Sequence, residues 1–247
     1  MSTRILYQLP LSHYCEKTRW NLEAKGLSFE ARTLFPGPHA RFARRVAGTR
    51  MLPILREGER YIADSTHIAL YLEQVYPEHP LIPSEPAEQA RVLELEDYFD
   101  SRGDHIRRWI WAHLIDGDNF RKLLFDAYPL PARLSGYALA PVMRLGLRRR
   151  YKVFPKQVTE SYQLMLEGLV RLEDELLHDP ARYLVGDRFT LADLTAAAMY
   201  APLIGPLGTP WDDDSVLPLV VRDLREACRE RVAGQWLMRI YAELRRP

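Results

Sequence analysis

The chain contains 247 residues, 47% of them apolar and 27% charged, with a formal net charge of +1 and two cysteines. Such a chain can bury the core of one large domain or two small ones, and its charge gives no general case for binding nucleic acid or an anionic membrane. It lacks an apolar run of roughly 18 residues, the length of a membrane span, and two cysteines cannot form a disulfide framework. We therefore expect a cytoplasmic protein that binds neither nucleic acid nor membrane.

The first part of the chain mixes strand and helix patterns. Residues 5–9 read as a strand closed by a proline, and the apolar spacing predicts a helix from about Tyr14 to Lys25. Gly26 stands where a glycine commonly ends a helix. Residues 29–34 alternate like a second strand, so this part predicts a β-α-β unit.

A hairpin and another helix are predicted next. Residues 52–55 and 60–63 flank Glu57-Gly58-Glu59, which is typical of a tight turn between two strands. A helix begins at Asp64-Ser65 and ends before the following proline. Its apolar residues share one predicted buried face: Ile68, Leu72 and Val75.

The remaining two thirds predict helices almost alone. Four prolines between residues 76 and 87 indicate an extended linker. Thr190-Leu191-Ala192-Asp193 fits a capping box at a helix start, whereas residues 116–155 are irregular and broken by prolines. One buried helical stripe is predicted, spaced by three and four residues: Val158, Tyr162, Met165, Leu169, Leu172 and Leu176. We expect an α/β domain over 1–83, a linker over 84–87 and an all-helical domain over 88–247.

The strongest candidate for chemistry is Ser12-His13-Tyr14-Cys15, at the predicted junction of the first strand and helix. Free backbone N–H groups and the helix dipole favour an anion there, and a thiolate is such an anion. Ser12 could stabilise the thiolate of a ligand, or Cys15 could form its own. The residues alone leave both possibilities open.

Five motifs in chain order resemble the cytosolic glutathione transferase superfamily. They are the Ser12–Cys15 segment, Leu52-Pro53, Asp64-Ser65, the proline-rich linker and Phe189-Thr190-Leu191-Ala192-Asp193. The resemblance implies a thioredoxin-like α/β N-terminal domain, an all-α C-terminal domain, glutathione as co-substrate, no metal and a homodimer.

The resemblance also implies roles for the residues around the expected glutathione site. The Leu52-Pro53 peptide would be cis and would turn the backbone of Leu52 toward the peptide ligand; an edge-strand proline without a ligand role is the alternative. Asp64 would pair with the γ-glutamyl ammonium and Ser65 with the carboxylate, although both residues also make ordinary helix caps. Arg50 is the candidate for the glycyl carboxylate, with His39, Arg41, Arg44 and Arg45 nearby.

Two residues compete for the active position. The Ser12–Cys15 segment resembles the Cys-Pro-Phe-Cys or Ser-Pro-Phe motif of Omega-like and Tau-like members, which places Ser12 at the position that contacts the sulfur. His13 stands where both motifs have a proline. The serine at the first position argues against Omega-type chemistry, in which that residue is a cysteine. Cys15 is the less favoured alternative, either as a reactive thiol or as a small core residue. Tyr7 lies within the strand run and is expected in the core.

The second-substrate pocket has weaker sequence support. Tyr14, Arg108 and Trp109 are candidates for its walls, and packing between domains explains the segment 104–111 equally well. The basic run 148–152 is expected to be a solvated helix face.

The sequence therefore predicts a transferase that activates glutathione through Ser12 and adds it to a small electrophile. Two alternatives stay open: Cys15-dependent thiol transfer or reduction, and a non-catalytic binding or scaffold protein with the same fold.

Overall fold

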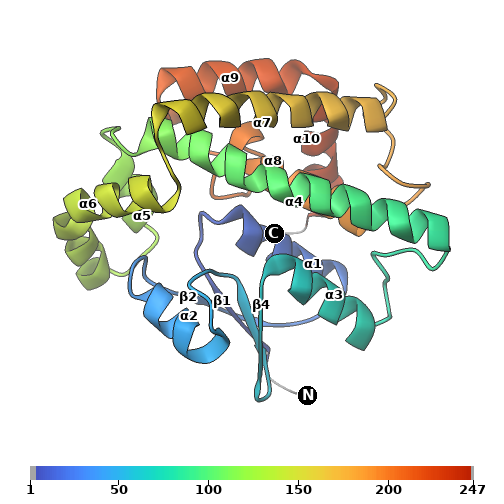
Figure 1. Cartoon of the computed structure of the whole chain (residues 1–247), viewed down its shortest axis with the longest axis horizontal. Helices are drawn as coiled ribbons and strands as arrows, with labels where there is room; N and C mark the ends of the chain where they lie inside the picture. The colour runs from blue at the N-terminus through green and yellow to red at the C-terminus, as the bar shows by residue number, and fades with distance from the viewer. Residues whose placement is uncertain (1–3, 246–247) are drawn as a thin grey trace.

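The computed structural model of the chain describes residues 4–245. Figure 1 shows a small sheet with its helices in blue to teal, and a larger helical part in green to red lying over it. This arrangement of a four-stranded sheet followed by helices confirms the predicted fold class.

Four strands form one sheet in the order β2-β1-β3-β4. β1 (Arg4–Gln8) pairs in parallel with β2 (Glu30–Thr33) and antiparallel with β3 (Ile54–Glu57), which forms the predicted hairpin with β4 (Arg60–Ala63). β3 begins two residues later than predicted. Pro53 explains the difference, because it has no backbone N–H to donate to a neighbouring strand.

Helices cover both faces of this sheet because successive strand residues point to opposite faces. α1 (His13–Ala24) and α3 (Ser65–Val75) pack on the face that carries Leu6 and Leu55. α2 (His39–Ala47) packs on the opposite face. Tyr7 is buried in this second layer, as expected, and its ring centre lies 4.5 Å from that of Phe42.

The buried face of α3 is shorter than predicted. Ile68 and Leu72 are fully buried, but Val75 is 41% exposed. Val75 is the last residue of α3, beyond the pair that packs on the sheet. Residues 76–85 then lead to α4 (Pro86–Leu114), and the exact division into domains stays a prediction.

The helical part is built around α8 (Leu191–Ile204), every residue of which is buried. Its start has the predicted capping box: Asp193 accepts hydrogen bonds from the backbone N–H and the hydroxyl of Thr190. Four further elements of this part are α7 (Pro155–Glu175), η1 (Asp214–Val216), α9 (Leu219–Glu230) and α10 (Val232–Leu244).

The predicted stripe of α7 is confirmed from Met165 to Leu176, where its four members are fully buried. Tyr162 is 36% exposed instead, because it packs at the edge of the core, with its ring centre 5.9 Å from that of Trp109.

Residues 116–155 form two further helices, α5 (Phe120–Phe125) and α6 (Leu130–Arg150), at one end of the molecule in Figure 1. Their prolines do not prevent this: Pro131 lies in the first turn of α6, where a missing N–H costs nothing, and only Pro141 lies inside the helix. The two helices share a separate small core around Phe120, Phe125 and Ala140. Among residues 4–245, no helix is both long and apolar enough to cross a membrane.

Candidate active site

Two adjoining cavities lie between the sheet and the helical part. The first, of about 540 Å³, has Ser12, Trp111 and Met143 in its wall and is termed the apolar cavity. The second, of about 620 Å³, has Pro53 and Ser65 in its wall and is termed the polar cavity. Five residues line both cavities and so mark where they meet: Met51, Leu52, Arg107, Arg150 and Tyr151.

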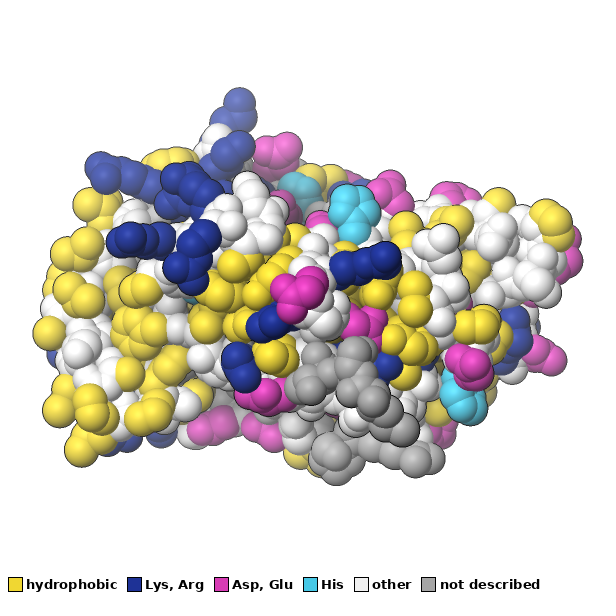
Figure 2. All heavy atoms as spheres, turned by 90° about the horizontal axis from the view of Figure 1, so that it is seen from below, with side chains coloured by type: hydrophobic (Ala, Val, Ile, Leu, Met, Phe, Trp, Pro, Cys, Tyr) yellow, Lys and Arg dark blue, Asp and Glu magenta, His cyan; other side chains and the backbone are white. Residues whose placement is uncertain are grey.

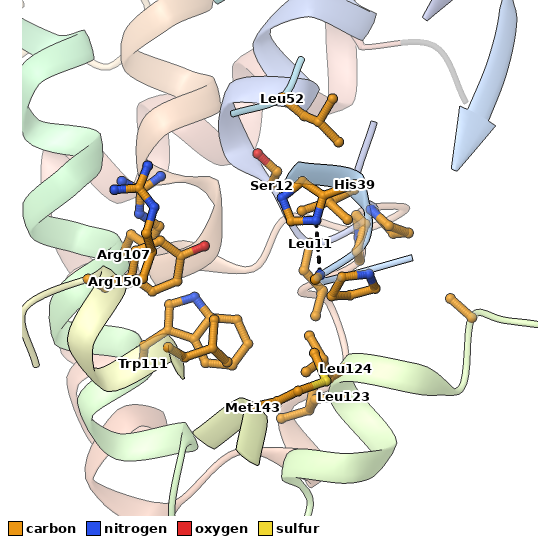
Figure 3. A pocket seen from close by; sticks show the side chains of 18 of the residues that line it. Leu11, Ser12, His39, Leu52, Arg107, Trp111, Leu123, Leu124, Met143 and Arg150 are labelled. Carbon is orange, nitrogen blue, oxygen red and sulfur yellow. Dashed lines mark hydrogen bonds between the residues drawn. The ribbon is translucent and has the colours of Figure 1, made fainter. Parts of the chain in front are cut away.

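Ser12 caps the start of α1 and lines the apolar cavity. Its backbone is extended (φ −96°, ψ 114°), and its Oγ accepts a hydrogen bond from the backbone N–H of Cys15 at 3.3 Å. In that bond the oxygen acts as an acceptor, and a serine hydroxyl can also donate one hydrogen bond. In Figure 3, Ser12 lies beside His39 and Leu52, across the cavity from Arg107 and Trp111.

Cys15 lies beneath this cap, with no exposed surface. Burial raises the pKa of its thiol, and this effect exceeds the opposing influence of Arg19 and of the hydrogen bond to Ser12. A fully buried, protonated thiol is a poor nucleophile. The surroundings of Cys15 are those of a core residue.

His13 and Tyr14, which lie between Ser12 and Cys15, also have inward-facing side chains. His13 is 2% exposed, and burial, followed by the charge of Arg107, lowers the pKa of its imidazole well below the ordinary value. Tyr14 lines the polar cavity and donates a hydrogen bond to the backbone oxygen of Asp100 or to Oδ1 of Asp104, each at 3.2 Å.

The Leu52-Pro53 peptide bond is cis. Cis peptide bonds occur almost only before proline, and this one was implied by the family resemblance. Leu52 is 7% exposed and lines both cavities, whereas Pro53 lines the polar cavity alone. The step therefore places backbone at the point where the cavities meet.

Asp64 and Ser65 stand on the far side of the polar cavity, at the start of α3. Asp64 has a φ of 79°, an uncommon value for a residue other than glycine, and its Oδ1 accepts hydrogen bonds from the N–H groups of Thr66 at 3.0 Å and His67 at 3.1 Å. The capping role of Asp64 is thus present, and it engages one carboxylate oxygen.

The buried ammonium group of Lys17 links the start of α3 to α1 and α4. Lys17 of α1 has no exposed surface, and its Nζ donates to Thr66 Oγ1 at 2.9 Å, to Asp100 Oδ1 at 2.5 Å and to Glu96. Thr66 also donates to Glu96 at 2.7 Å. These contacts join α1, α3 and α4 next to the polar cavity. None of them was predicted from the sequence.

Arg107 is the basic residue placed most centrally. It lines both cavities and forms a salt bridge with Asp104, one turn earlier on α4. Its guanidinium carbon lies 5.3 Å from the ring centre of Tyr14 and 4.5 Å from that of Tyr151, within the range of a cation–π contact. Both arginines belong to the segment 104–111, from which the sequence singled out Arg108 instead.

Arg108 does line the polar cavity, but its guanidinium is engaged elsewhere. It donates to the backbone oxygen of Tyr151 at 2.8 Å and to Ser161 Oγ at 2.6 Å. Both partners lie outside α4, so Arg108 fastens that helix to the start of α7 and its preceding connection.

The aromatic wall also differs from the expectation. Trp109 is 5% exposed, belongs to the main helical core and lines neither cavity among the described residues. Trp111, two residues later, lines the apolar cavity instead. The rest of the apolar wall comes from α5 and α6, the segment whose role the sequence left open: Leu123, Leu124, Met143 and Leu147.

Basic residues gather where the loop before β3 faces α6. Arg50 and His39 line the apolar cavity, as does Arg150, which also contacts Met51. Burial lowers the pKa of His39, and the charges of Arg150 and Arg50 lower it further. Within residues 4–245, neither Arg50 nor Arg150 forms a salt bridge, and no group of acidic, His and Cys side chains could hold a metal ion.

Comparison with known proteins shows what the part of the chain that contains the sheet is similar to. Residues 6–80 match the family model described as glutathione S-transferase, N-terminal domain. The N-terminal part of this chain is therefore similar to glutathione S-transferase N-terminal domains. Curated relatives agree: the chain is 37% identical to glutathione S-transferase 1 of Dianthus caryophyllus over 89 residues, which are 34% of this chain and 40% of the relative. The first such relatives are matched over only about two fifths of their own length.

Longer matches extend over both parts of the chain. A probable maleylacetoacetate isomerase of Vibrio cholerae is 27% identical over 201 residues, 78% of either chain. The crystal structure of the β-etherase LigF from Sphingobium sp. strain SYK-6 superimposes with a TM-score of 0.63 at 23% identity, over 96% of this chain and 99% of that one. At that identity, the structural likeness shows that both parts share the glutathione transferase fold.

Proposed function

We propose that this protein is a glutathione transferase that activates the glutathione thiol through Ser12 for attack on a small electrophile. One observation carries the proposal: the hydroxyl of Ser12 lies in the wall of the apolar cavity beside Leu52, which lines both cavities. If the glutathione sulfur is held there, the rest of the peptide would occupy the polar cavity and the electrophile would approach from the apolar cavity.

The charges of the polar cavity support glutathione as the ligand. Glutathione carries one ammonium and two carboxylates, so it needs both acidic and basic partners. Asp64, Asp100 and Asp104 line the polar cavity together with Arg107 and Arg150. The hydroxyl of Ser65, at the start of α3, adds a donor for a carboxylate. We propose Arg50, at the edge of the apolar cavity, as a further partner for the glycyl carboxylate.

In the proposed reaction, the bound thiol first loses its proton to solvent. A hydrogen bond from Ser12 to the sulfur favours the thiolate over the thiol and so lowers the thiol pKa. The thiolate electron pair then forms a carbon–sulfur bond to the electrophile, whose leaving group departs with its own electron pair. Trp111 and the apolar residues of α5 and α6 would bind the electrophile.

The two alternatives have less support. Thiol transfer by Cys15 would need a mixed disulfide on a thiol that has no exposed surface and a raised pKa. A scaffold with a vestigial site would not need the acidic and basic groups that converge on the polar cavity. We retain a cytoplasmic homodimer as part of the proposal, which light scattering during size-exclusion chromatography would test.

The proposal is tested by isothermal titration calorimetry with glutathione and by conjugation of glutathione to 1-chloro-2,4-dinitrobenzene. Wild type should bind and conjugate glutathione, and Ser65→Ala should weaken binding roughly tenfold, the effect of losing one hydrogen bond to a charged group. Ser101→Ala, on an exposed serine of α4, is the matched control and should bind as wild type does. Absence of glutathione binding by wild type would refute the proposal.

A further inference from the structure

α6 presents an apolar surface to solvent. Five of its large apolar side chains are between 48% and 70% exposed: Leu130, Leu134, Leu139, Val142 and Leu145. Leu134, Val142 and Leu145 also share one side of the helix by their spacing. Scattered exposed apolar residues are ordinary, but a continuous outward face of this kind marks an interaction surface.

The opposite side of α6 packs against α5 and lines the apolar cavity, and these contacts fix the orientation of the helix. Gly136 and Ala140 are buried, and a side chain at Gly136 would meet the ring of Phe125 at 2.4 Å. Met143 and Leu147 face the apolar cavity. The outward face therefore has no role in the fold of the chain itself.

The same segment is strongly basic. Residues 127–159 contain no Asp or Glu, in a chain whose net charge is only +1. They contain seven basic residues: Arg133, Arg144, Arg148, Arg149, Arg150, Lys152 and Lys156. Within the described part of the chain, only Arg148 among these forms a salt bridge, with Asp116.

The apolar and basic groups lie at one end of the molecule. Figure 1 shows α6 at that end, and Figure 2 shows hydrophobic side chains covering it next to a gathering of Lys and Arg side chains. A helix with an exposed apolar face and adjacent arginines and lysines suits the interface of a lipid bilayer, where apolar groups enter the acyl boundary and cations meet anionic headgroups.

We propose that α6 is a docking surface for anionic membranes, through its outward apolar face and the basic residues at its C-terminal end. A second copy of the chain suits this surface less well, because pairing α6 with its own copy would bring together two segments that contain no acidic residue. An anionic bilayer supplies the missing negative charge over the whole face. The net charge of +1 averages over this local concentration of cations and so does not reveal it.

The test is co-sedimentation of the full chain with vesicles of phosphatidylcholine alone and of phosphatidylcholine mixed equally with phosphatidylglycerol. Binding is expected only with the anionic vesicles and should be lost in high salt. Val142→Asp and Arg149→Glu, both exposed and outside either cavity, should each lower the partition coefficient about tenfold. Val170→Asp on α7 and Arg222→Glu on α9 are matched controls and should bind as wild type does.

Equal binding to neutral vesicles, or no binding to anionic ones, would overturn the proposal. So would equal losses in the α6 variants and their controls. A change of oligomeric state in Val142→Asp, without vesicle binding by wild type, would assign the face to a second copy instead. Glutathione binding measured on the same samples reports separately on the proposed function and on folding of each variant.

Discussion

The Oγ of Ser12 accepts a hydrogen bond from the backbone N–H of Cys15 at 3.3 Å, and the thiol of Cys15 is sealed from solvent below that contact. Two potential sulfur-handling groups three residues apart therefore have opposite environments. The hydroxyl lies in a cavity wall and the thiol lies in the core.

Ser12 variants separate the proposed donor role from the capping role. Ser12→Ala should lower kcat/KM for conjugation roughly tenfold to a hundredfold, the loss expected for a hydrogen bond to a charged sulfur. Ser12→Gly is tolerated at an N-cap but has no side-chain donor, whereas Ser12→Thr keeps both the cap and the hydroxyl. The pH profile of kcat/KM should move to higher pH in Ser12→Ala and Ser12→Gly but not in Ser12→Thr. An unchanged profile in Ser12→Gly would contradict the donor role.

Cys15 should be chemically silent in the folded protein. Iodoacetamide should label neither Cys15 nor Cys228 under native conditions, because both are buried and burial raises the pKa of both thiols, that of Cys228 to about 11. Mass spectrometry after labelling with and without denaturant measures this. Cys15→Ala should retain conjugation activity. Loss of activity in this variant, together with labelling of Cys15 in native wild type, would favour thiol transfer instead.

Truncation of Trp111 should change substrate binding, whereas truncation of Trp109 should change stability. Trp111→Ala removes part of the apolar cavity wall and should raise KM for an aromatic electrophile about tenfold, with little effect on KM for glutathione. Trp109→Ala opens the core and should lower the free energy of unfolding by about 3 kcal/mol. Steady-state kinetics and urea denaturation distinguish the two. A specific KM effect in Trp109→Ala would restore it as a substrate residue.

Lys17 should be essential for stability because it neutralises buried acids. Lys17→Met leaves Glu96 and Asp100 without their cation and should lower the free energy of unfolding by about 3 kcal/mol. The double variant Lys17→Met/Glu96→Gln removes a carboxylate as well and should recover part of that loss. Urea denaturation of the single and double variants tests the coupling, and simple additivity of the Lys17→Met and Glu96→Gln effects would argue against it.

Asp214 should make stability depend on acid pH. Burial opposes its ionisation, but hydrogen bonds from Arg225 and Arg229 outweigh this and lower the pKa of Asp214 in the folded state. A lowered folded pKa contributes stability above the unfolded pKa, near 3.9, and that contribution is lost as pH falls through the folded value.

Asp214→Asn should therefore be less stable than wild type at neutral pH, and the difference should shrink below about pH 4. Thermal unfolding across this range measures it. Asp223→Asn, on an exposed residue of α9, is the control. A difference between wild type and Asp214→Asn that stays constant down to the lowest pH would contradict the assigned linkage.

Local patterns were sufficient for the four strands, for α1, α3 and α7, and for the start of α8. Alternation identified β2, three- and four-residue spacing identified α7, and Thr190 and Asp193 formed the capping box that their spacing predicted. These features depend on neighbours within one turn or one strand, so they can be recognised from the chain alone. Val75 was misjudged because burial at a helix end depends on what lies beyond it.

The sequence by itself determined the helix starts at Ser12 and Asp64, and its resemblance to a known family predicted the cis Leu52-Pro53 bond that the structure contains. Only the tertiary structure decided that Cys15 is sealed, that Arg107 rather than Arg108 stands between the cavities, and that Trp111 replaces Trp109 in the wall. Residues one or two positions apart on a helix differ by about 100° or 200° in direction. Which direction meets a cavity is fixed by the packing of α4 against elements far away in the chain, and no local pattern contains that information.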